Sequence, residues 1–293
     1  MLLLLDNGSR RAAAALNLRR LALHLSERLG TEVHAVSAQH SSKIPAAELG
    51  GVPAWTLEPF LRAQLTAGER EFGILPLFFG PSRAVGGFVP DVAGRVAAEL
   101  GAFELRVADV LCPLPAGEPR LARILADNVQ AALSAPVSGE APEVLLVDHG
   151  SPLPAVTAVR NWLAHRLTEQ LETAPADGFD QRVQVAEAVM ERREGAEYDF
   201  NGRLLADVLD DLGAAGGGAP RTVVLAMQFI SPGRHAGAGG DIADIVAAAE
   251  ARHPGLDLRV TRLIGEHPLF LDILADRAAT LAGRAPMALQ TAG

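Results

Sequence analysis

Short apolar runs alternate with segments of helical spacing along the second half of the chain. The strand-like runs span 144–148, 183–189, 222–230 and 256–263, and segments with apolar residues three or four positions apart span 155–171, 201–212, 241–252 and 269–281. Runs that are apolar throughout are typical of parallel strands buried on both faces. The pattern therefore predicts a parallel four-stranded sheet flanked by helices.

The first half follows the same order, and short sequence matches link the two halves. Residues 3–9 resemble 145–151, residues 78–84 resemble 229–235, residues 105–107 match 258–260, and residues 124–127 match 273–276. Matches in the same order with slowly drifting offsets indicate a duplication. We expect two tandem Rossmann-like α/β domains, at 1–134 and 143–293, joined by a Pro-, Ser- and Gly-rich linker at 135–142.

Composition narrows the function classes. The 293 residues are 49% hydrophobic and carry a net charge of −9, which fits a globular protein and disfavours a broad nucleic-acid-binding surface. The one cysteine, Cys112, excludes an intrachain disulfide and a Cys-based zinc site. The apolar run at 1–5 is too short to span a membrane and lacks a basic flank. We expect a cytoplasmic protein with no nucleic-acid or membrane partner.

Three polar side chains follow three strands of the second predicted sheet. His149 comes directly after the strand at 144–148, Glu191 lies two residues after the second strand, and His235 lies in the loop after the third. Ligand sites of parallel sheets lie beyond the carboxyl ends of the strands. Histidine with carboxylate suits Fe, Co, Ni and Zn, with a position left open for substrate. A lone histidine in such a loop can equally cap a helix or face solvent, and this alternative stays open.

The same loops could also suggest a nucleotide site or a serine nucleophile, but the motifs of both are absent from the sequence. The run Gly237-Ala238-Gly239-Gly240 is glycine-rich, but neither half has G-x-G-x-x-G in its first strand-to-helix turn, and the chain has no P-loop. We therefore expect no nucleotide, and a steric role for these glycines against a flat ligand. Ser151 lacks the G-x-S-x-G context of a nucleophile and is interpreted as a turn residue.

The segments 147–151, 229–235 and 253–269 resemble the sirohydrochlorin chelatase family, the class II chelatases of cobalamin and sirohaem synthesis. The resemblance covers most of the chain, in two copies. It implies His149 and His235 as catalytic residues that hold the metal together with Glu191. It also implies a lyase of the cobaltochelatase or ferrochelatase type. Such an enzyme inserts Co²⁺ or Fe²⁺, with Ni²⁺ as a third candidate, into sirohydrochlorin or a related tetrapyrrole without ATP; the metal is a substrate.

The first half departs from the family pattern. Asn7 stands at the first histidine position, Ala84 or Phe88 at the second, and Ala38 at about the position of the glutamate. We therefore expect a degenerate metal site in the first domain. A non-catalytic tetrapyrrole- or metal-carrying protein derived from a chelatase is the alternative function, and the chain could be a monomer with pseudo-two-fold repeats or a homodimer. The expected substrate-binding residues are Arg234, Gly237, Gly239, Gly240, Arg10 and Arg83.

Overall fold

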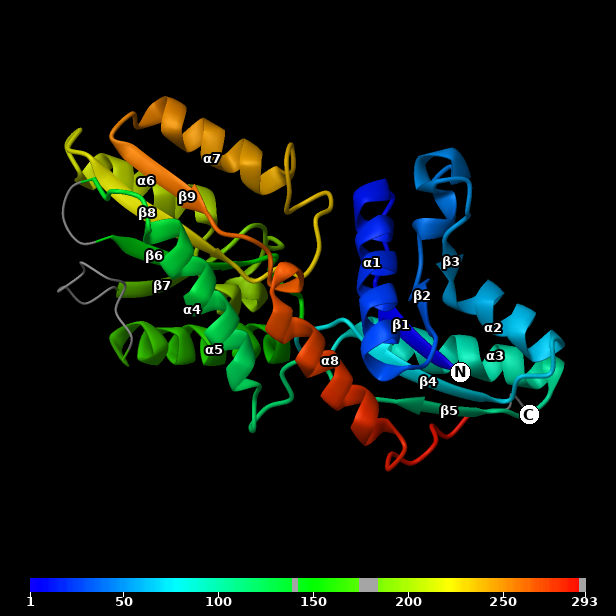
Figure 1. Cartoon of the computed structure of the whole chain (residues 1–293). Coiled ribbons are helices and arrows are strands. Elements are labelled where there is room, and N and C mark those ends of the chain that lie inside the picture. Colours follow the sequence, from blue (N-terminus) through cyan, green and yellow to red (C-terminus); the bar gives the residue numbers. More distant parts are fainter. Residues whose placement is uncertain (139–141, 174–183, 290–293) are drawn as a thin grey trace. The chain divides into compact units, whose positions relative to one another are not determined.

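The computed structural model describes residues 1–138, 142–173 and 184–289. They form two compact units (Figure 1): unit 1 consists of Met1–Pro113 and Leu271–Gly293, and unit 2 of Leu114–Phe270. Each unit is built around one parallel sheet. In the part of the chain that is described, no helix is long and apolar enough to cross a bilayer.

Unit 1 contains a sheet with the strand order β3-β2-β1-β4-β5. Leu3 and Leu5 are completely buried and pack with residues of α2 and α3 in one apolar cluster. The elements are β1 (Leu2–Asp6), α1 (Ala12–Leu29), β2 (Val33–Ser37), β3 (Trp55–Thr56), α2 (Leu57–Thr66), β4 (Glu71–Pro76), α3 (Val89–Leu100) and β5 (Glu104–Val107), with short helical turns η1 (Ser41–Lys43), η2 (Ala46–Leu49) and η3 (Ala84–Phe88).

Unit 2 contains a sheet with the strand order β7-β6-β8-β9. Leu145 and Val147 of its central strand pack with residues of α6 and α7, while α4 packs on α5 and on β8. The elements are α4 (Pro119–Leu133), β6 (Glu143–Asp148), α5 (Pro154–Thr173), β7 (Gln184–Val189), η4 (Ala196–Asn201), α6 (Leu205–Ala215), β8 (Arg221–Met227), α7 (Asp241–Arg252), β9 (Leu256–Val260) and η5 (Ile264–Glu266), and α8 (Pro268–Leu281) follows.

The predicted α/β fold with two parallel sheets is confirmed, with one correction. The first sheet has five strands where four were expected, because Val36 pairs with Trp55 and Ser37 with Thr56 at its edge. A strand of two residues is too short to produce an apolar period in the sequence. In unit 2, the strand expected to reach residue 230 ends at Met227, where its neighbour β6 provides its last partner, Val147.

The last helix of each sequence half packs in the unit of the other half. From the first half, Asn128 of α4 donates to Arg262 O (3.2 Å), and Asp127 lies 3.5 Å from His267, both within unit 2. From the second half, Arg277 of α8 donates to the carbonyl of Leu111 (3.1 Å) within unit 1. The compact units are therefore not identical to the expected sequence domains 1–134 and 143–293, which remain a proposal about the duplication.

The expected linker at 135–142 is described only up to residue 138 and again from 142. Its first residues bind unit 2: Arg259 donates to the carbonyl of Ala135 (3.1 Å), and Ser138 N donates to Thr222 Oγ1 (2.9 Å). Residues 135–138 therefore follow the surface of unit 2.

Candidate metal centre in unit 2

The strand order places the three predicted ligands next to one another. β6 lies between β7 and β8, and these strands precede His149, Glu191 and His235 respectively. The chain runs from β6 to β7 on one side of the sheet and then from β7 to β8 on the other side of β6. The carboxyl ends of β6 and β8 therefore form the topological switch point of the unit. Open α/β sheets bind their ligands at this point.

A glycine turn brings the backbone of Glu191 against the end of β6. Gly150 has φ +89°, and a Cβ at this position would lie 2.0 Å from the carbonyl oxygen of Glu191. Only glycine permits both this backbone conformation and this approach. Glu191 N then donates to His149 O (3.2 Å), so the two residues are held side by side through their main chains.

His149 presents its Nε2 atom toward Glu191. Its Nδ1 lies 3.0 Å from the carbonyl oxygen of Gly150. A carbonyl can only accept, so Nδ1 carries the hydrogen and the neutral ring keeps its lone pair on Nε2. Nε2 lies 3.2 Å from Glu191 Oε1. Two acceptor atoms at this distance can share one cation, either a proton or a metal.

The same distance fits a shared metal ion. Nitrogen and oxygen donors bind transition metals at about 2.1 Å, so two donors of one tetrahedral ion are about 3.4 Å apart. The 3.2 Å between His149 Nε2 and Glu191 Oε1 is close to that value. The pair therefore offers two donors to one ion with little rearrangement.

His235 completes the cluster and is oriented by an aspartate. Its ring lies 4.4 Å from that of His149, between centroids, at an interplanar angle of 75°. Its Nδ1 lies 2.7 Å from Oδ2 of Asp241, the first residue of α7. The carboxylate accepts the Nδ1 hydrogen, which leaves Nε2 for a metal or a proton. The next residue, Ala236, is 1% exposed and anchors the loop in the core.

The three side chains remain accessible. The exposed fractions are 44% for His149, 58% for Glu191 and 30% for His235. No group of three or more His, Cys, Asp or Glu side chains in the described ranges is already arranged around one point as a metal site, so binding by all three requires a side-chain adjustment. An open, adjustable site suits an ion that is delivered rather than retained.

Asp148 lies beneath the cluster as the last residue of β6. Burial raises the pKa of this carboxyl, and the neighbouring Arg160 guanidinium, the Gly150 amide and His149 act against that rise. Asp148 Oδ1 accepts from both Gly150 N and Arg160, each at 3.2 Å. The carboxyl therefore joins the metal-site turn to α5.

Ser151 has the turn role predicted for it. Its Oγ accepts from Leu153 N (3.1 Å), just before α5 begins. Asn201, which is 1% exposed, accepts from Ser151 N and donates to Ser151 O, both at 2.9 Å. The clamp fixes the backbone two residues beyond His149. Sequence reasoning missed Asn201, whose only signal was a polar residue before a helix.

The glycine loop and Arg234 adjoin His235. Gly237 and Gly239 have φ +131° and +67°, and a Cβ at Gly240 would lie 2.8 Å from Arg234 O. Arg234 is 69% exposed, with Nε 3.6 Å from Asp241 Oδ2. The backbone conformation of the loop is thus sufficient to explain these glycines. Their predicted contacts with substrate remain a proposal.

In unit 1 the equivalent positions are clear from register. Asp6 pairs with Ser37 as Asp148 pairs with Val189, and Gln39 N donates to Asn7 O (3.2 Å) as Glu191 N does to His149 O. The counterpart of Glu191 is therefore Gln39, and the prediction of Ala38 was wrong by one residue. The sequence does not show where β2 ends, so it cannot align the residues after β2 with those after β7 to within one position.

The second histidine position follows from the other strand pair. Leu2 pairs with Gly73 and Val144 with Val224, which carries His235 onto Ala84 rather than Phe88. Two more candidates, Arg10 and Arg83, are exposed residues of unit 1 that follow β1 and β4; their role as substrate contacts remains a proposal.

Part of the chain matches a known protein family. Residues 143–281 match the model of the CbiX family. This part of the chain belongs to that family. The resemblance to sirohydrochlorin chelatases that the sequence indicated is thereby confirmed. No curated protein matches the chain.

Solved chelatase structures share the fold at low identity. SirB from Bacillus subtilis with Fe³⁺ is 15% identical, with a TM-score of 0.66 over 96% of this chain and 94% of that one. SirB from Bacillus subtilis subspecies spizizenii in complex with cobalt is 14% identical, with a TM-score of 0.63 over the same shares. CbiX, described as the terminal enzyme of sirohaem synthesis in denitrifying bacteria, is 17% identical, with a TM-score of 0.52 over 95% and 98%.

Proposed function

We propose that the protein inserts Co²⁺ or Fe²⁺, with Ni²⁺ as a third candidate, into sirohydrochlorin or a related tetrapyrrole without ATP. The observation that carries the proposal is a pair of neighbouring imidazoles whose Nδ1 atoms are both engaged, which leaves each Nε2 for a metal or a proton. The Nε2 of His149 also lies 3.2 Å from Glu191 Oε1. The family match and the titles of the SirB structures, one with Fe³⁺ and one with cobalt, support it.

The reaction exchanges two pyrrolic protons for one divalent ion and transfers no electrons, so its balance requires neither nucleotide nor redox partner. His149, Glu191 and His235 hold the ion first. When the ion leaves for the ring nitrogens, each imidazole Nε2 recovers its lone pair and can accept one of the protons released. Glu191 balances the positive charge in both stages, because either a metal or a protonated imidazole faces it.

The test is metal insertion by the purified full chain. Sirohydrochlorin is supplied without oxygen, with Co²⁺, Fe²⁺ or Ni²⁺ in turn, and the absorbance change is compared with the rate without protein. We expect acceleration with at least one metal, and a loss of about 100-fold or more in His149→Ala and His235→Ala. Asn7→Ala, at the equivalent position of unit 1, should keep most of the activity. Equal losses in all three variants would contradict a single site in unit 2.

The second candidate is a non-catalytic carrier of tetrapyrrole or metal. It is favoured by Asn7 and Gln39, which replace the first histidine and the glutamate in unit 1 and leave that unit without this ligand pair. Tight binding of sirohydrochlorin or Co²⁺ with no acceleration for any of the three metals would decide for the carrier.

A further inference from the structure

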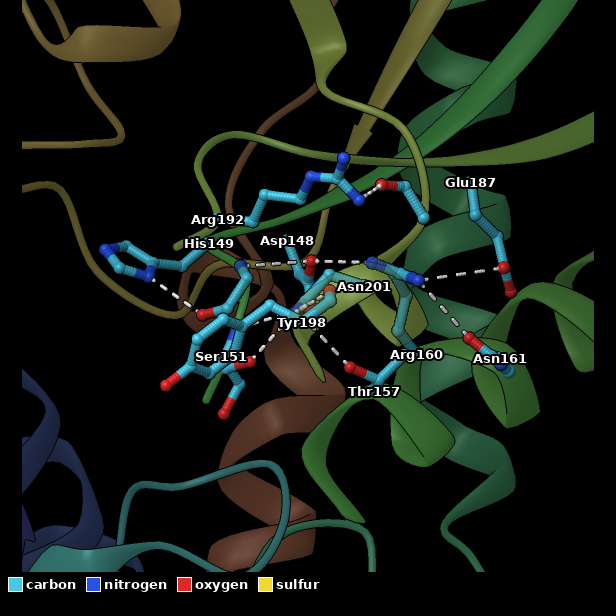
Figure 2. Close-up of polar contacts among 12 residues, drawn as sticks. Asp148, His149, Ser151, Thr157, Arg160, Asn161, Glu187, Arg192, Tyr198 and Asn201 are labelled. Atoms are coloured by element: carbon cyan, nitrogen blue, oxygen red, sulfur yellow. Dashed lines mark hydrogen bonds and ion pairs between the residues drawn. The ribbon is translucent and has the colours of Figure 1, made fainter. Parts of the chain in front are cut away.

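A buried arginine lies behind the candidate metal centre. Arg160 of α5 is 2% exposed and is among the largest fully buried side chains described. Its guanidinium lies between two carboxylates on neighbouring strands (Figure 2): Nη1 is 3.2 Å from Asp148 Oδ1 on β6, and Nη2 is 3.9 Å from Glu187 Oε2 on β7. Asp148 immediately precedes His149, and Glu187 lies four residues before Glu191. The arginine thus spans the two strands that deliver the first two ligands.

The fold itself does not need this charge. In unit 1, α1 begins at Ala12 and α5 begins at Pro154, the same distance after the equivalent residues Asp6 and Asp148. Arg160 therefore corresponds to Leu18, and Glu187, which pairs with Leu146, corresponds to Ala35, which pairs with Leu4. Unit 1 builds the same strand, turn and helix with apolar residues at both places.

Burial of the arginine is costly to the fold. Its Nε has no hydrogen-bond partner among the described residues, and a buried ion pair is often no more stabilising than apolar residues of similar volume. Unit 1 has such an apolar pair, and the unit with the histidines and the glutamate has the ion pairs. This difference points to a role in the site rather than in stability.

A chain of hydrogen bonds connects the arginine to the ligand atom. Arg160 donates to Asp148 Oδ1, which also accepts from Gly150 N. The carbonyl of the same Gly150 accepts the Nδ1 hydrogen of His149 (3.0 Å), and this leaves the Nε2 lone pair directed at Glu191. The Asp148 carboxylate therefore links the Arg160 guanidinium to the amide of Gly150, the residue whose carbonyl orients the His149 ring.

We propose that Arg160 is a positioning residue of the metal centre, acting through Asp148 and Gly150 on His149. That the ion held there is the metal of the reaction rests on the proposed function. The positioning role itself concerns only the ability of His149 to bind a divalent cation.

The experiment measures Co²⁺ alone, without tetrapyrrole, on the full chain. Arg160→Leu combined with Glu187→Ala reproduces the unit 1 residues Leu18 and Ala35. We expect it to fold, as unit 1 does with Asp6 beside Leu18, although Asp148 loses its arginine. Its Co²⁺ affinity, followed by the visible absorption of bound Co²⁺, should fall about 10- to 100-fold with a changed spectrum. The single substitution Arg160→Lys keeps a positive charge beside Asp148. It should therefore keep part of the Co²⁺ affinity that Arg160→Leu/Glu187→Ala loses.

Arg259→Leu is the matched control. Arg259 is also a largely buried arginine of unit 2, paired with Asp257 (2.7 Å) and with main-chain carbonyls of residues 132 and 135. Its loss should lower the melting temperature but keep the Co²⁺ affinity and spectrum. An Arg160→Leu/Glu187→Ala protein that melts cooperatively and binds Co²⁺ as the wild type does would overturn the proposal. A wild type that binds Co²⁺ but inserts no metal would instead refute the proposed function alone.

Discussion

Asp6→Asn should stabilise unit 1 at neutral pH. Asp6 is the last residue of β1, and its Oδ1 is buried without a hydrogen-bond partner in the described residues. Burial raises the pKa of this carboxyl from 3.8 to about 6, although hydrogen bonds from Ser37 and Gly8 act in the other direction. The equivalent Asp148 has Arg160 beside it, whereas Asp6 has Leu18 at that position.

The raised pKa sets the sign of the effect. Between pH 3.8 and about 6 the folded state keeps a proton that the unfolded state releases, so the free energy of unfolding falls as the pH rises through this window. A rise of the pKa from 3.8 to about 6 corresponds to about 3 kcal/mol. The Asp6 side chain is partly exposed, and water screening lowers the figure. We expect Asp6→Asn to gain about 1–3 kcal/mol above pH 6 and nothing below pH 3.8, where both side chains are neutral.

The assay uses tryptophan fluorescence during urea unfolding. Trp55 belongs to unit 1 and Trp162 to unit 2, and the chain has no other tryptophan. In a Trp162→Phe background, Trp55 reports on unit 1, and the unfolding free energy is measured between pH 3.5 and 8. Asp91→Asn, at an exposed residue in the first turn of α3, is the control and should give no gain at neutral pH. A gain that is the same at every pH, or a loss at pH 7.5, would refute the reasoning.

Three further changes test the metal centre. Glu191→Gln should weaken Co²⁺ binding at least about 10-fold without a lower melting temperature, because its side chain is 58% exposed; an unchanged titration would remove it from the ligand set. Asp241→Asn should cost about 10- to 100-fold in Co²⁺ affinity, with Asp244→Asn, in the same first helical turn, as a neutral control. Gly239 has φ +67° and open space at its Cβ, so Gly239→Asn should be tolerated by the backbone better than Gly239→Val. Weaker sirohydrochlorin binding in the folded Asn variant supports a loop that contacts substrate, and unchanged binding argues against it.

The sequence predicts the edge of the sheet better than the details of the site. Apolar runs identify β6, β7 and β8, and the rule that ligands lie at their carboxyl ends brings His149, Glu191 and His235 together. The tandem halves are equally visible in sequence. Which sheet each last helix covers is not, because the apolar face of α4 or α8 carries no information about its partner.

The supporting residues were missed for a different reason. An arginine in an amphipathic helix is normally assigned to the solvent face. Arg160 is buried because α5 packs it against carboxylates of β6 and β7, and helical spacing alone does not predict that contact. Asp241, at the start of α7, looks like an ordinary acidic residue in a first helical turn. Its contact with His235 depends on the path of the loop between them, which no periodicity describes.

A comparison of the two units distinguishes the role of the turn in the fold from the role proposed for it in metal binding. Both keep an aspartate at the end of the first strand and a glycine two residues later, and in both a Cβ on that glycine would strike a carbonyl on the neighbouring strand, at 1.8 Å for Gly8 and 2.0 Å for Gly150. The turn therefore belongs to the fold. Unit 1 differs at two of the proposed ligands and at the proposed positioning pair, with Asn7, Gln39, Leu18 and Ala35 in place of His149, Glu191, Arg160 and Glu187. Unit 1 keeps the aspartate of the turn, Asp6, but has Leu18 in place of the arginine. Hydrogen bonds from Ser37 and Gly8 offset only part of the cost of burying the Asp6 carboxylate, because its pKa is still raised to about 6. For this reason removal of that charge should stabilise unit 1 at neutral pH.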